Sequence, residues 1–410
     1  MLKNIDESKN SLIRATIVLK PSRETSLKRR HLWVFSGAVA QVEGKPEVGD
    51  LVRVVTCQHE EIALGLYEGD SIFVRILTFT PDLFTSEEDL FRERLNAAYR
   101  LRLALGLIRS DNNVYRLVYG EGDGLPGLII DVYGSTAVLQ AHTVGMYRRR
   151  TLIAHILQGD FPEFGIKAVF DKSVMTLPET MDFATVNSYL VGEAMEEPLF
   201  ENGLRIAADW LHGQKTGFFI DQRENRALVA QYAKDKHVLN LFSYTGGFSL
   251  YALKGGAAKV VSLDSSKRAT EAAAQAVNDN FEEAIAARHD TVTEDAFEYL
   301  SGLTKGTYDL IIVDPPAFAK RRGNIRNALS GYRKLNALAL EKVASQGFVF
   351  TFSCSQLVSL QDFRLALLTA SLDAQRPIRI LRQLGQAPCH PINIYHPETE
   401  YLKGFLLYVE

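Results

Sequence analysis

Short apolar runs alternate with polar breaks along the first part of the chain. Between residues 15 and 79 the runs are rich in Val, Ile and Leu, and breaks that contain Gly and Asp separate them. This pattern predicts strands joined by turns, as in a small β-barrel. Polar residues and a proline follow at 81–89, and Leu and Arg then recur with helical spacing over 90–107. We therefore expect a first domain over residues 14–90.

Strands and one helix follow one another in the second part of the chain. The segments with strand or helix character lie at 115–119, 128–133, 137–142, 146–157 and 166–170. Together they predict a small α+β domain over residues 91–190. Beyond it, the Asn202-Gly203 pair predicts a two-residue hairpin turn, because both residues tolerate positive φ angles.

Continuous apolar strands alternate with amphipathic helices from about residue 222 onward. We expect strands at 238–242, 260–264, 310–314 and 347–352, and helices that begin near Gly247, Lys267 and Gly331. This alternation is typical of a parallel sheet with helices on both faces. Residues 191–410 are therefore predicted to form a doubly wound α/β domain.

Length and composition narrow the class of protein. The chain has 410 residues, of which 46% are hydrophobic and 23% are charged, as in folded proteins of several domains. No apolar run approaches the length of a membrane span, so we expect a cytoplasmic protein that does not bind membranes. Three widely spaced cysteines support neither a disulfide framework nor a Cys-rich zinc site, and no metal is expected. We interpret Cys57 and Cys389 as small buried hydrophobic residues.

Basic residues are clustered although the net charge is only −3. A single cluster is most often a solvated face, but several clusters, one of them beside the best catalytic motif, favour contacts with phosphates. A further cluster lies at residues 148–150. The residues that we assign to RNA binding are Arg23, Lys28, Arg29, Arg30, Lys320, Arg321 and Arg322.

The residues that follow each strand of the third domain describe a nucleoside site, because ligands of open α/β sheets bind at the carboxyl ends of the strands. Asp264 is placed to accept hydrogen bonds from ribose hydroxyls, and Asp295 lies where an adenine amino group could be met. Glycines in the turn after the first strand let the backbone approach a ligand. The residues of that turn that we assign to the site are Asn240, Phe242, Ser243, Tyr244, Thr245, Gly246 and Gly247.

Two motifs carry the candidate chemistry. In Asp314-Pro315-Pro316 the prolines end a strand abruptly and hold the carboxylate at the sheet edge, where it can serve both catalysis and the cofactor site. Cys354 leaves the next strand between two serines. A thiolate there can add to C6 of a pyrimidine and make C5 nucleophilic toward a methyl donor. A positive charge or hydrogen-bond donor must raise the thiolate fraction, and the sequence does not identify that group.

Four motifs in combination resemble the bacterial family of 23S ribosomal RNA 5-methylcytosine methyltransferases with an N-terminal PUA domain. They are Gly213–Arg223, Asn240–Phe248, Asp314–Phe318 and Phe352–Ser355. The resemblance implies a Rossmann-like class I domain that uses S-adenosyl-L-methionine, preceded by a PUA-like domain that contacts RNA, either 23S rRNA or a large-subunit precursor. It also implies that Asp264 binds the ribose and that Cys354 is the nucleophile. The residues that it adds to the cofactor pocket are Lys215, Phe218, Asp221 and Arg223.

Two other functions stay open from the residues alone. The first is methylation of a purine nitrogen, with Asp314 orienting the amino group and Cys354 serving only the structure. The second is a non-catalytic RNA-binding protein of ribosome assembly that retains a cofactor fold. The sequence also leaves open whether the protein is a homodimer.

Overall fold

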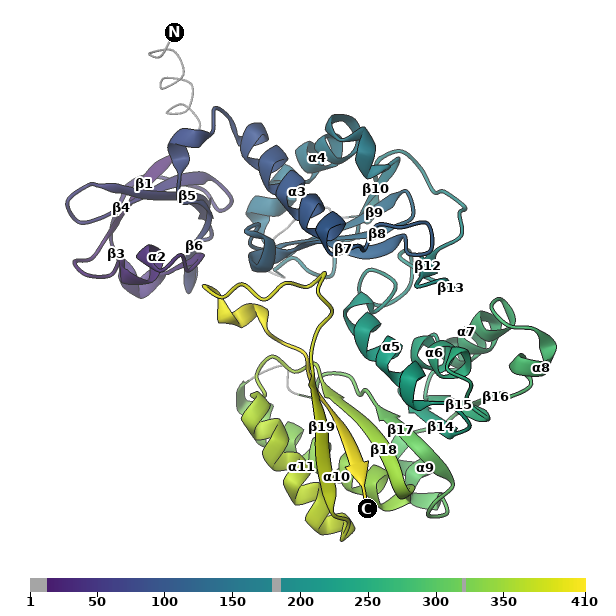
Figure 1. Ribbon diagram of the computed structural model, residues 1–410. Coiled ribbons are helices and arrows are strands. Elements are labelled where there is room, and N and C mark those ends of the chain that lie inside the picture. The colour runs from purple at the N-terminus through teal and green to yellow at the C-terminus, as the bar shows by residue number, and fades with distance from the viewer. Residues whose placement is uncertain (1–12, 179–185, 319–321) are drawn as a thin grey trace. The chain divides into compact units, whose positions relative to one another are not determined.

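The computed structural model describes residues 13–178, 186–318 and 322–410. They form two compact units, each of which is described by itself (Figure 1). The first unit comprises Met1–Leu199, Ala208–Phe218 and Pro388–Thr399. The second comprises Phe200–Ala207, Phe219–Ala387 and Glu400–Glu410. Among the described residues, no helix has the length and apolar character needed to cross a bilayer.

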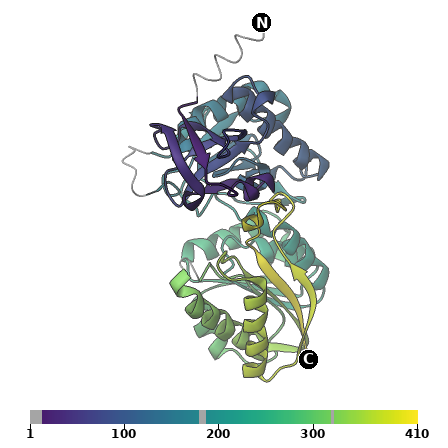
Figure 2. The same ribbon diagram turned by 90° about the vertical axis from the view of Figure 1, so that its left-hand side faces the viewer.

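The first unit begins with a strongly curved six-stranded sheet, drawn in purple in Figure 1 and Figure 2. Alternate residues such as Ile17, Val52 and Val54 are fully buried, as a strand with one core-facing side requires. The strands in sheet order are β2 (Trp33–Phe35), β6 (Ile72–Thr78), β5 (Glu61–Tyr67), β4 (Leu51–Val55), β1 (Ala15–Leu19) and β3 (Val39–Gly44), and the short helix α2 (Thr25–Lys28) follows β1. The predicted barrel strands are confirmed; β2 and β3 were not predicted.

A five-stranded sheet with two helices makes up the rest of the first unit. Its strands in sheet order are β11 (Ser188–Val191), β10 (Ala168–Asp171), β9 (Thr136–Ala141), β8 (Leu128–Tyr133) and β7 (Val114–Tyr119), with helices α3 (Glu87–Ala104) and α4 (Val144–His155). Helix α3 begins three residues before the predicted helix, because the Ser86 hydroxyl accepts from the Asp89 N–H at 3.1 Å and caps it there. Fully buried Arg102 in α3 donates to Asp123 Oδ2 at 2.8 Å and to the Cys389 carbonyl at 2.6 Å. It thereby anchors the segment Pro388–Thr399 within this unit.

The second unit starts with the predicted hairpin, β12 (Phe200–Glu201) and β13 (Leu204–Arg205). The turn residues Asn202 and Gly203 have φ angles of 50° and 77°, which confirms the predicted turn chemistry. Glu201 accepts from Arg226 at 2.8 and 2.7 Å and from the Tyr251 hydroxyl at 3.1 Å. These buried bonds fasten the hairpin to helices α5 (Arg223–Tyr232) and α6 (Gly247–Lys254).

A seven-stranded sheet forms the centre of the second unit. In sheet order its strands are β16 (His289–Thr293), β15 (Lys259–Asp264), β14 (His237–Leu241), β17 (Tyr308–Val313), β18 (Val343–Ser353), β20 (Lys403–Val409) and β19 (Ile378–Leu384). The first five are parallel, whereas β20 runs antiparallel to both of its neighbours. The four predicted strands, β14, β15, β17 and β18, are all parallel, which confirms the predicted parallel sheet; β16, β19 and the antiparallel β20 were not predicted.

Helices cover both faces of this sheet (Figure 1). Val238 packs in the core on one side, and its neighbour Leu239 packs in the core on the other, as the two-residue period of a strand requires. One face is covered by α5, α6 and α7 (Lys267–Asn278), and the other by α9 (Ala296–Gly302), α10 (Ile325–Lys342) and α11 (Leu360–Ala374); the short α8 (Glu283–Ala286) follows α7. The order of the strands reverses at β14, so the crevice expected to bind ligands lies where β14 and β17 end.

Helix α10 corrects one predicted boundary. The sequence suggested that it begins near Gly331, but it begins at Ile325. Gly331 lies within the helix, where a Cβ atom would come within 3.1 Å of the Phe318 ring. This glycine therefore permits close packing on Phe318 and does not mark the start of the helix.

Candidate active site

The turn between β14 and α6 has an unusual backbone. Phe242, Tyr244 and Gly246 have φ angles of 57°, 46° and 80°, and two of these residues are aromatic, for which positive φ is strained. At Gly246 a Cβ atom would lie 2.9 Å from the Ala273 Cβ, so only glycine fits there. Strain held by surrounding structure is common at binding sites, and here it shapes the loop at the switch point of the sheet.

Asp264 ends β15 beside this loop. Its Oδ2 accepts from the Tyr244 N–H at 3.0 Å, and its Oδ1 accepts from the Ser266 N–H at 2.9 Å. Each carboxylate oxygen has two lone pairs, so each can accept one further bond. The half-buried carboxylate is therefore held rigidly in place with capacity for two hydroxyl donors.

Three buried oxygen acceptors occur in this part of the unit without a hydrogen-bond partner among the described residues. They are Asp221 Oδ1, Asn240 Oδ1 and Ser243 Oγ. The Asn240 amide nitrogen donates to Ser249 Oγ at 3.0 Å, so only its oxygen is left. Leaving such an atom unsatisfied costs about 1–3 kcal/mol. A ligand that brings N–H or O–H donors would remove this cost.

Asp314 ends β17 and has a strongly perturbed acidity. Burial raises its pKa to about 7, with the nearby Asp221 carboxylate adding to the effect, while Gln222 and Arg226 oppose it. The Tyr401 hydroxyl donates to Asp221 Oδ2 and helps to keep that second carboxylate in place. A carboxyl group with such a pKa can hold or release a proton near neutral pH.

Cys354 lies beside the Asp314 motif, as the sequence predicts. It follows β18, the sheet neighbour of β17, and its half-buried Sγ lies 3.7 Å from the carbonyl oxygen of Pro315. The adjacent Ser355 is buried, and its hydroxyl bonds with Tyr332 at 3.1 Å. The two motifs that carry the candidate chemistry therefore meet at one edge of the sheet.

Lys403 is a residue of this site that sequence reasoning missed. It begins β20, pairs with Ser353 in the ladder, and is 5% exposed. Its Nζ donates to the carbonyl oxygen of Ser355 at 2.8 Å, which places an ammonium group beside Cys354. Burial lowers the pKa of Lys403 to about 8, and the Cys354 thiol opposes this shift. The available signal was a single lysine at the head of an otherwise apolar strand.

The remaining predicted cofactor residues have varied surroundings. Asp295 is exposed and caps α9, accepting from the N–H groups of Phe297 and Glu298 at 2.8 and 3.2 Å. Arg223 is buried, with Nε 3.5 Å from Glu201 Oε2. Lys215 and Phe218 belong to the first unit, where Lys215 is exposed and Phe218 is buried. Their contacts with a cofactor stay predictions, as do those of Phe242, Thr245 and Gly247.

The two other cysteines differ from each other. Cys389 is fully buried, which confirms its interpretation as a core residue. Cys57 is only half-buried, so that interpretation is wrong for it. It lies in the turn after β4, and its Sγ donates to the Gln58 side-chain oxygen at 3.1 Å.

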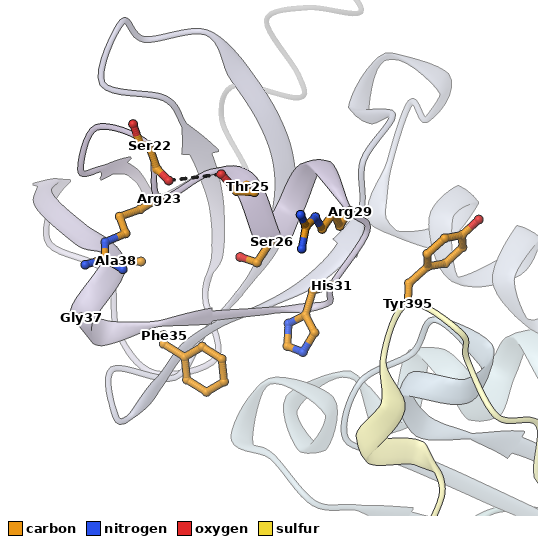
Figure 3. Close-up of a pocket in the computed structure, with 10 residues that line it drawn as sticks. All are labelled: Ser22, Arg23, Thr25, Ser26, Arg29, His31, Phe35, Gly37, Ala38 and Tyr395. Atoms are coloured by element: carbon orange, nitrogen blue, oxygen red, sulfur yellow. Dashed lines mark hydrogen bonds between the residues drawn. The ribbon is translucent and has the colours of Figure 1, made fainter.

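Two of the predicted RNA-binding residues line a cavity of the first unit. Figure 3 shows Arg23 and Arg29 around this hollow together with Phe35 and Tyr395; its volume is about 640 Å³. Lys28 is ion-paired with Glu24 at 3.3 Å, and the Arg30 guanidinium lies 5.1 Å from the centre of the Phe79 ring. Lys320 and Arg321 lie outside the described residues, and only the backbone of Arg322 is described.

The cluster at residues 148–150 serves the structure. Arg148 pairs with Asp50 at 3.2 Å and Arg149 with Glu87 at 2.5 Å. Arg150 lies 3.1 Å from Asp171 Oδ2. All three arginines are therefore engaged with carboxylates of the first unit.

Comparison with known proteins defines the class. A family model for S-adenosylmethionine-dependent methyltransferases matches residues 174–359, and one for PUA-like domains matches residues 17–79. Two solved structures share the fold. A candidate SAM-dependent methyltransferase from Streptococcus mutans has a TM-score of 0.78 at 22% identity over 96% of this chain and 100% of that one. A candidate methyltransferase complexed with SAH has a TM-score of 0.79 at 23% identity with the same coverage. The chain is thus an S-adenosylmethionine-dependent methyltransferase with a PUA-like domain.

Two curated relatives match almost the whole chain. Ribosomal RNA large subunit methyltransferase I of Pseudoalteromonas atlantica is 38% identical over 396 residues, which cover 95% of this chain and 98% of that protein. The protein of the same name from Escherichia coli strain SMS-3-5 is 37% identical over 394 residues, again 95% of this chain and 98% of that protein. The chain belongs to the family of ribosomal RNA large subunit methyltransferase I. The fold class and the cofactor expected from the sequence are confirmed.

Proposed function

We propose that this protein methylates C5 of a cytosine in 23S ribosomal RNA, or in a precursor of the large subunit, through a covalent adduct between Cys354 and C6. The single observation that carries the proposal is the position of Cys354. Its Sγ contacts the Asp314-Pro-Pro turn, and the Lys403 ammonium is bonded to the next residue along the chain. A nucleophile, a titratable carboxyl group and a positive charge are thus gathered at the ligand-binding edge of the sheet.

The residues of the second unit suit S-adenosylmethionine, which supplies the electrophilic methyl group. Asp264 keeps one free acceptor position on each oxygen and is assigned to the two ribose hydroxyls. The unpartnered oxygens of Asp221, Asn240 and Ser243 are acceptors of the kind that an α-ammonium group requires. Gly246 leaves room for the loop to adopt this shape.

The first chemical steps have candidate groups in the chain. Lys403 stabilises the Cys354 thiolate, which adds to C6 of the cytosine. Asp314, with its pKa of about 7, donates its proton to N3 as the ring loses aromaticity, so that C5 becomes an enamine carbon able to accept a methyl group. After the methyl group has been transferred to C5, a base removes the C5 proton and the thiolate leaves C6. N3 returns its proton to the Asp314 carboxylate, which restores the aromatic ring and the starting state of the enzyme.

Product analysis with cysteine variants tests this proposal. We expect Cys354→Ala to abolish methyl transfer to unmodified 23S rRNA while it still binds S-adenosylmethionine, and Cys57→Ser, a change outside the site, to act as wild type. Nucleoside mass spectrometry should find 5-methylcytidine. A methylated purine, or full activity of Cys354→Ala, would exclude the cysteine mechanism and favour purine-nitrogen methylation. Absence of cofactor binding would favour the non-catalytic alternative.

A trapping experiment examines the adduct directly. In RNA with 5-fluorocytidine at the target, C5 carries fluorine in place of the proton, so the enzyme cannot be released after methylation. Wild type should form a protein–RNA species that survives denaturing electrophoresis, and Cys354→Ala should form none.

The proposal also includes the domain boundaries and the part of the chain that contacts RNA. We assign residues 14–90, 91–190 and 191–410 to the PUA-like, central and methyltransferase domains. The PUA-like domain is assigned to RNA contact through Arg23 and Arg29, which border its cavity. A cytoplasmic location and a homodimer stay predictions.

A further inference from the structure

Three side chains with metal-binding atoms converge in the first unit, outside the methyl-transfer site. His31 precedes β2 in the barrel, while His396 and Glu398 lie in the segment Pro388–Thr399. Glu398 Oε2 lies 3.4 Å from His31 Nε2 and 3.6 Å from His396 Nε2. One ligand atom from each residue can be chosen so that all three lie within 4.8 Å of one another.

His396 is a buried member of this cluster, and the packing around it does not satisfy its ring nitrogens. Its side chain is 1% exposed, yet neither ring nitrogen has a hydrogen-bond partner among the described residues. A buried imidazole ordinarily donates through one nitrogen and accepts through the other. An ion pair between His31 and Glu398 alone would leave both His396 nitrogens unsatisfied.

Two of the three separations between the ligand atoms are close to those of a tetrahedral metal site. Two ligand atoms at the usual zinc distances of about 2.0–2.1 Å lie about 3.3–3.4 Å apart across a tetrahedron. The two separations from Glu398 Oε2 are close to this value. His31 Nδ1 also lies 3.3 Å from the Trp33 carbonyl oxygen. The Trp33 N–H also lies 3.3 Å from Nδ1, so the tautomer decides which of the two contacts is made. In the tautomer that leaves Nε2 for a metal, Nδ1–H donates to the carbonyl, an outer support common to ligating histidines; in the other tautomer, Nδ1 accepts from the Trp33 N–H.

We propose that His31, His396 and Glu398 bind a first-row transition metal ion, zinc by preference, with solvent completing the coordination. This ligand set of two imidazoles and one carboxylate is one that zinc accepts. The ion ties the segment Pro388–Thr399 to the barrel. It thereby fixes Tyr395, which lines the cavity together with His31 and Arg29 (Figure 3). The sequence predicted no metal site, because its three cysteines are widely spaced and the histidines of this cluster are far apart along the chain.

Titration of the chelator-treated, full-length protein with zinc sulfate tests the site. Calorimetry should show one ion per chain, and cobalt should give the visible absorption of a tetrahedral complex. We expect His31→Ala and Glu398→Gln to weaken zinc binding at least tenfold. The matched control is His59→Ala, which removes an exposed histidine 3.1 Å from Glu43 in the same barrel and should bind zinc as wild type does.

The decisive variant is His396→Phe. It keeps a ring against Trp33, whose centroid lies 4.4 Å from that of His396, so the fold should survive, as circular dichroism can verify. Zinc binding and the cobalt spectrum should nevertheless be lost. A folded His396→Phe protein that binds zinc with wild-type affinity would overturn the proposal, and so would a wild type that binds no zinc at this stoichiometry.

Discussion

Replacing Lys403 by Met should raise the pKa of the Cys354 thiol. The substitution keeps a long apolar stem in the buried position and removes only the ammonium group, whose Nζ lies 2.8 Å from the Ser355 carbonyl. Two unit charges 4–8 Å apart interact by about 2–4 kcal/mol at an effective dielectric constant of 20. This range corresponds to about 1.5–3 pK units.

Alkylation of Cys354 by iodoacetamide measures this effect as a function of pH. Below the thiol pKa, the alkylation rate is proportional to the fraction of thiol present as thiolate, which falls tenfold for each unit by which the pKa rises. A more basic thiolate is also a better nucleophile, and this offsets roughly half of the change in the logarithm of the rate. We therefore expect Lys403→Met to slow alkylation about 5- to 40-fold at a pH below both thiol pKa values. Peptide mass spectrometry separates Cys354 from half-buried Cys57.

Two control variants make the result interpretable. Lys403→Arg retains the positive charge and should keep most of the rate, whereas Lys305→Met removes an exposed charge elsewhere in the second unit and should change nothing. Retained cofactor binding shows that Lys403→Met is folded. If a folded Lys403→Met protein has the same pH profile as wild type, the ammonium group does not stabilise the thiolate and the reasoning fails.

Three further predictions concern the cofactor loop and the acidic pair. Asp314→Asn should abolish methyl transfer and yet stabilise the second unit above pH 7. The pKa of Asp314 is about 7 in the native state and about 3.8 in the unfolded state, so the wild type loses stability as the pH rises from 3.8 to 7. Asparagine cannot ionise and avoids this loss. In denaturant unfolding at pH 8, the variant should therefore be more stable than wild type by an amount on the order of 2–4 kcal/mol. Gly246→Ala should destabilise the unit by about 1–3 kcal/mol in thermal unfolding, because φ is 80° and the new Cβ meets Ala273. Asp264→Ala should weaken S-adenosylmethionine binding at least tenfold in calorimetry; unchanged affinity would contradict the ribose assignment.

The strand ends could be predicted from the sequence because the residues just before them are mostly apolar and buried. Asp264, Asp314 and Cys354 each lie at such a strand end, and parallel strands bring their carboxyl ends to one edge. Their grouping could therefore be predicted without any tertiary information. The Asn202-Gly203 turn could also be predicted, because its positive φ angles depend on those two residues alone and not on distant contacts.

Other features depend on contacts that no local pattern reports. Lys403 lies beside Cys354 only because β20 enters the sheet antiparallel to β18. Strand β19 is mostly exposed, so its sequence lacks the apolar run of a central strand. His31 and His396 are distant in sequence, and their approach depends on how the segment Pro388–Thr399 packs in the first unit.

The position of β20 has a consequence for synthesis of the protein on the ribosome. Strands emerge in chain order, so β18 and β19 are made before the strand that lies between them. Until residues 403–409 emerge, the seven residue pairs between β18 and β20 cannot form, and β19 has no strand to pair with. The same residues carry the ammonium group beside Cys354. A nascent chain therefore completes this sheet and gains the ammonium group beside Cys354 in the same step, when residues 403–409 pair with β18 and β19.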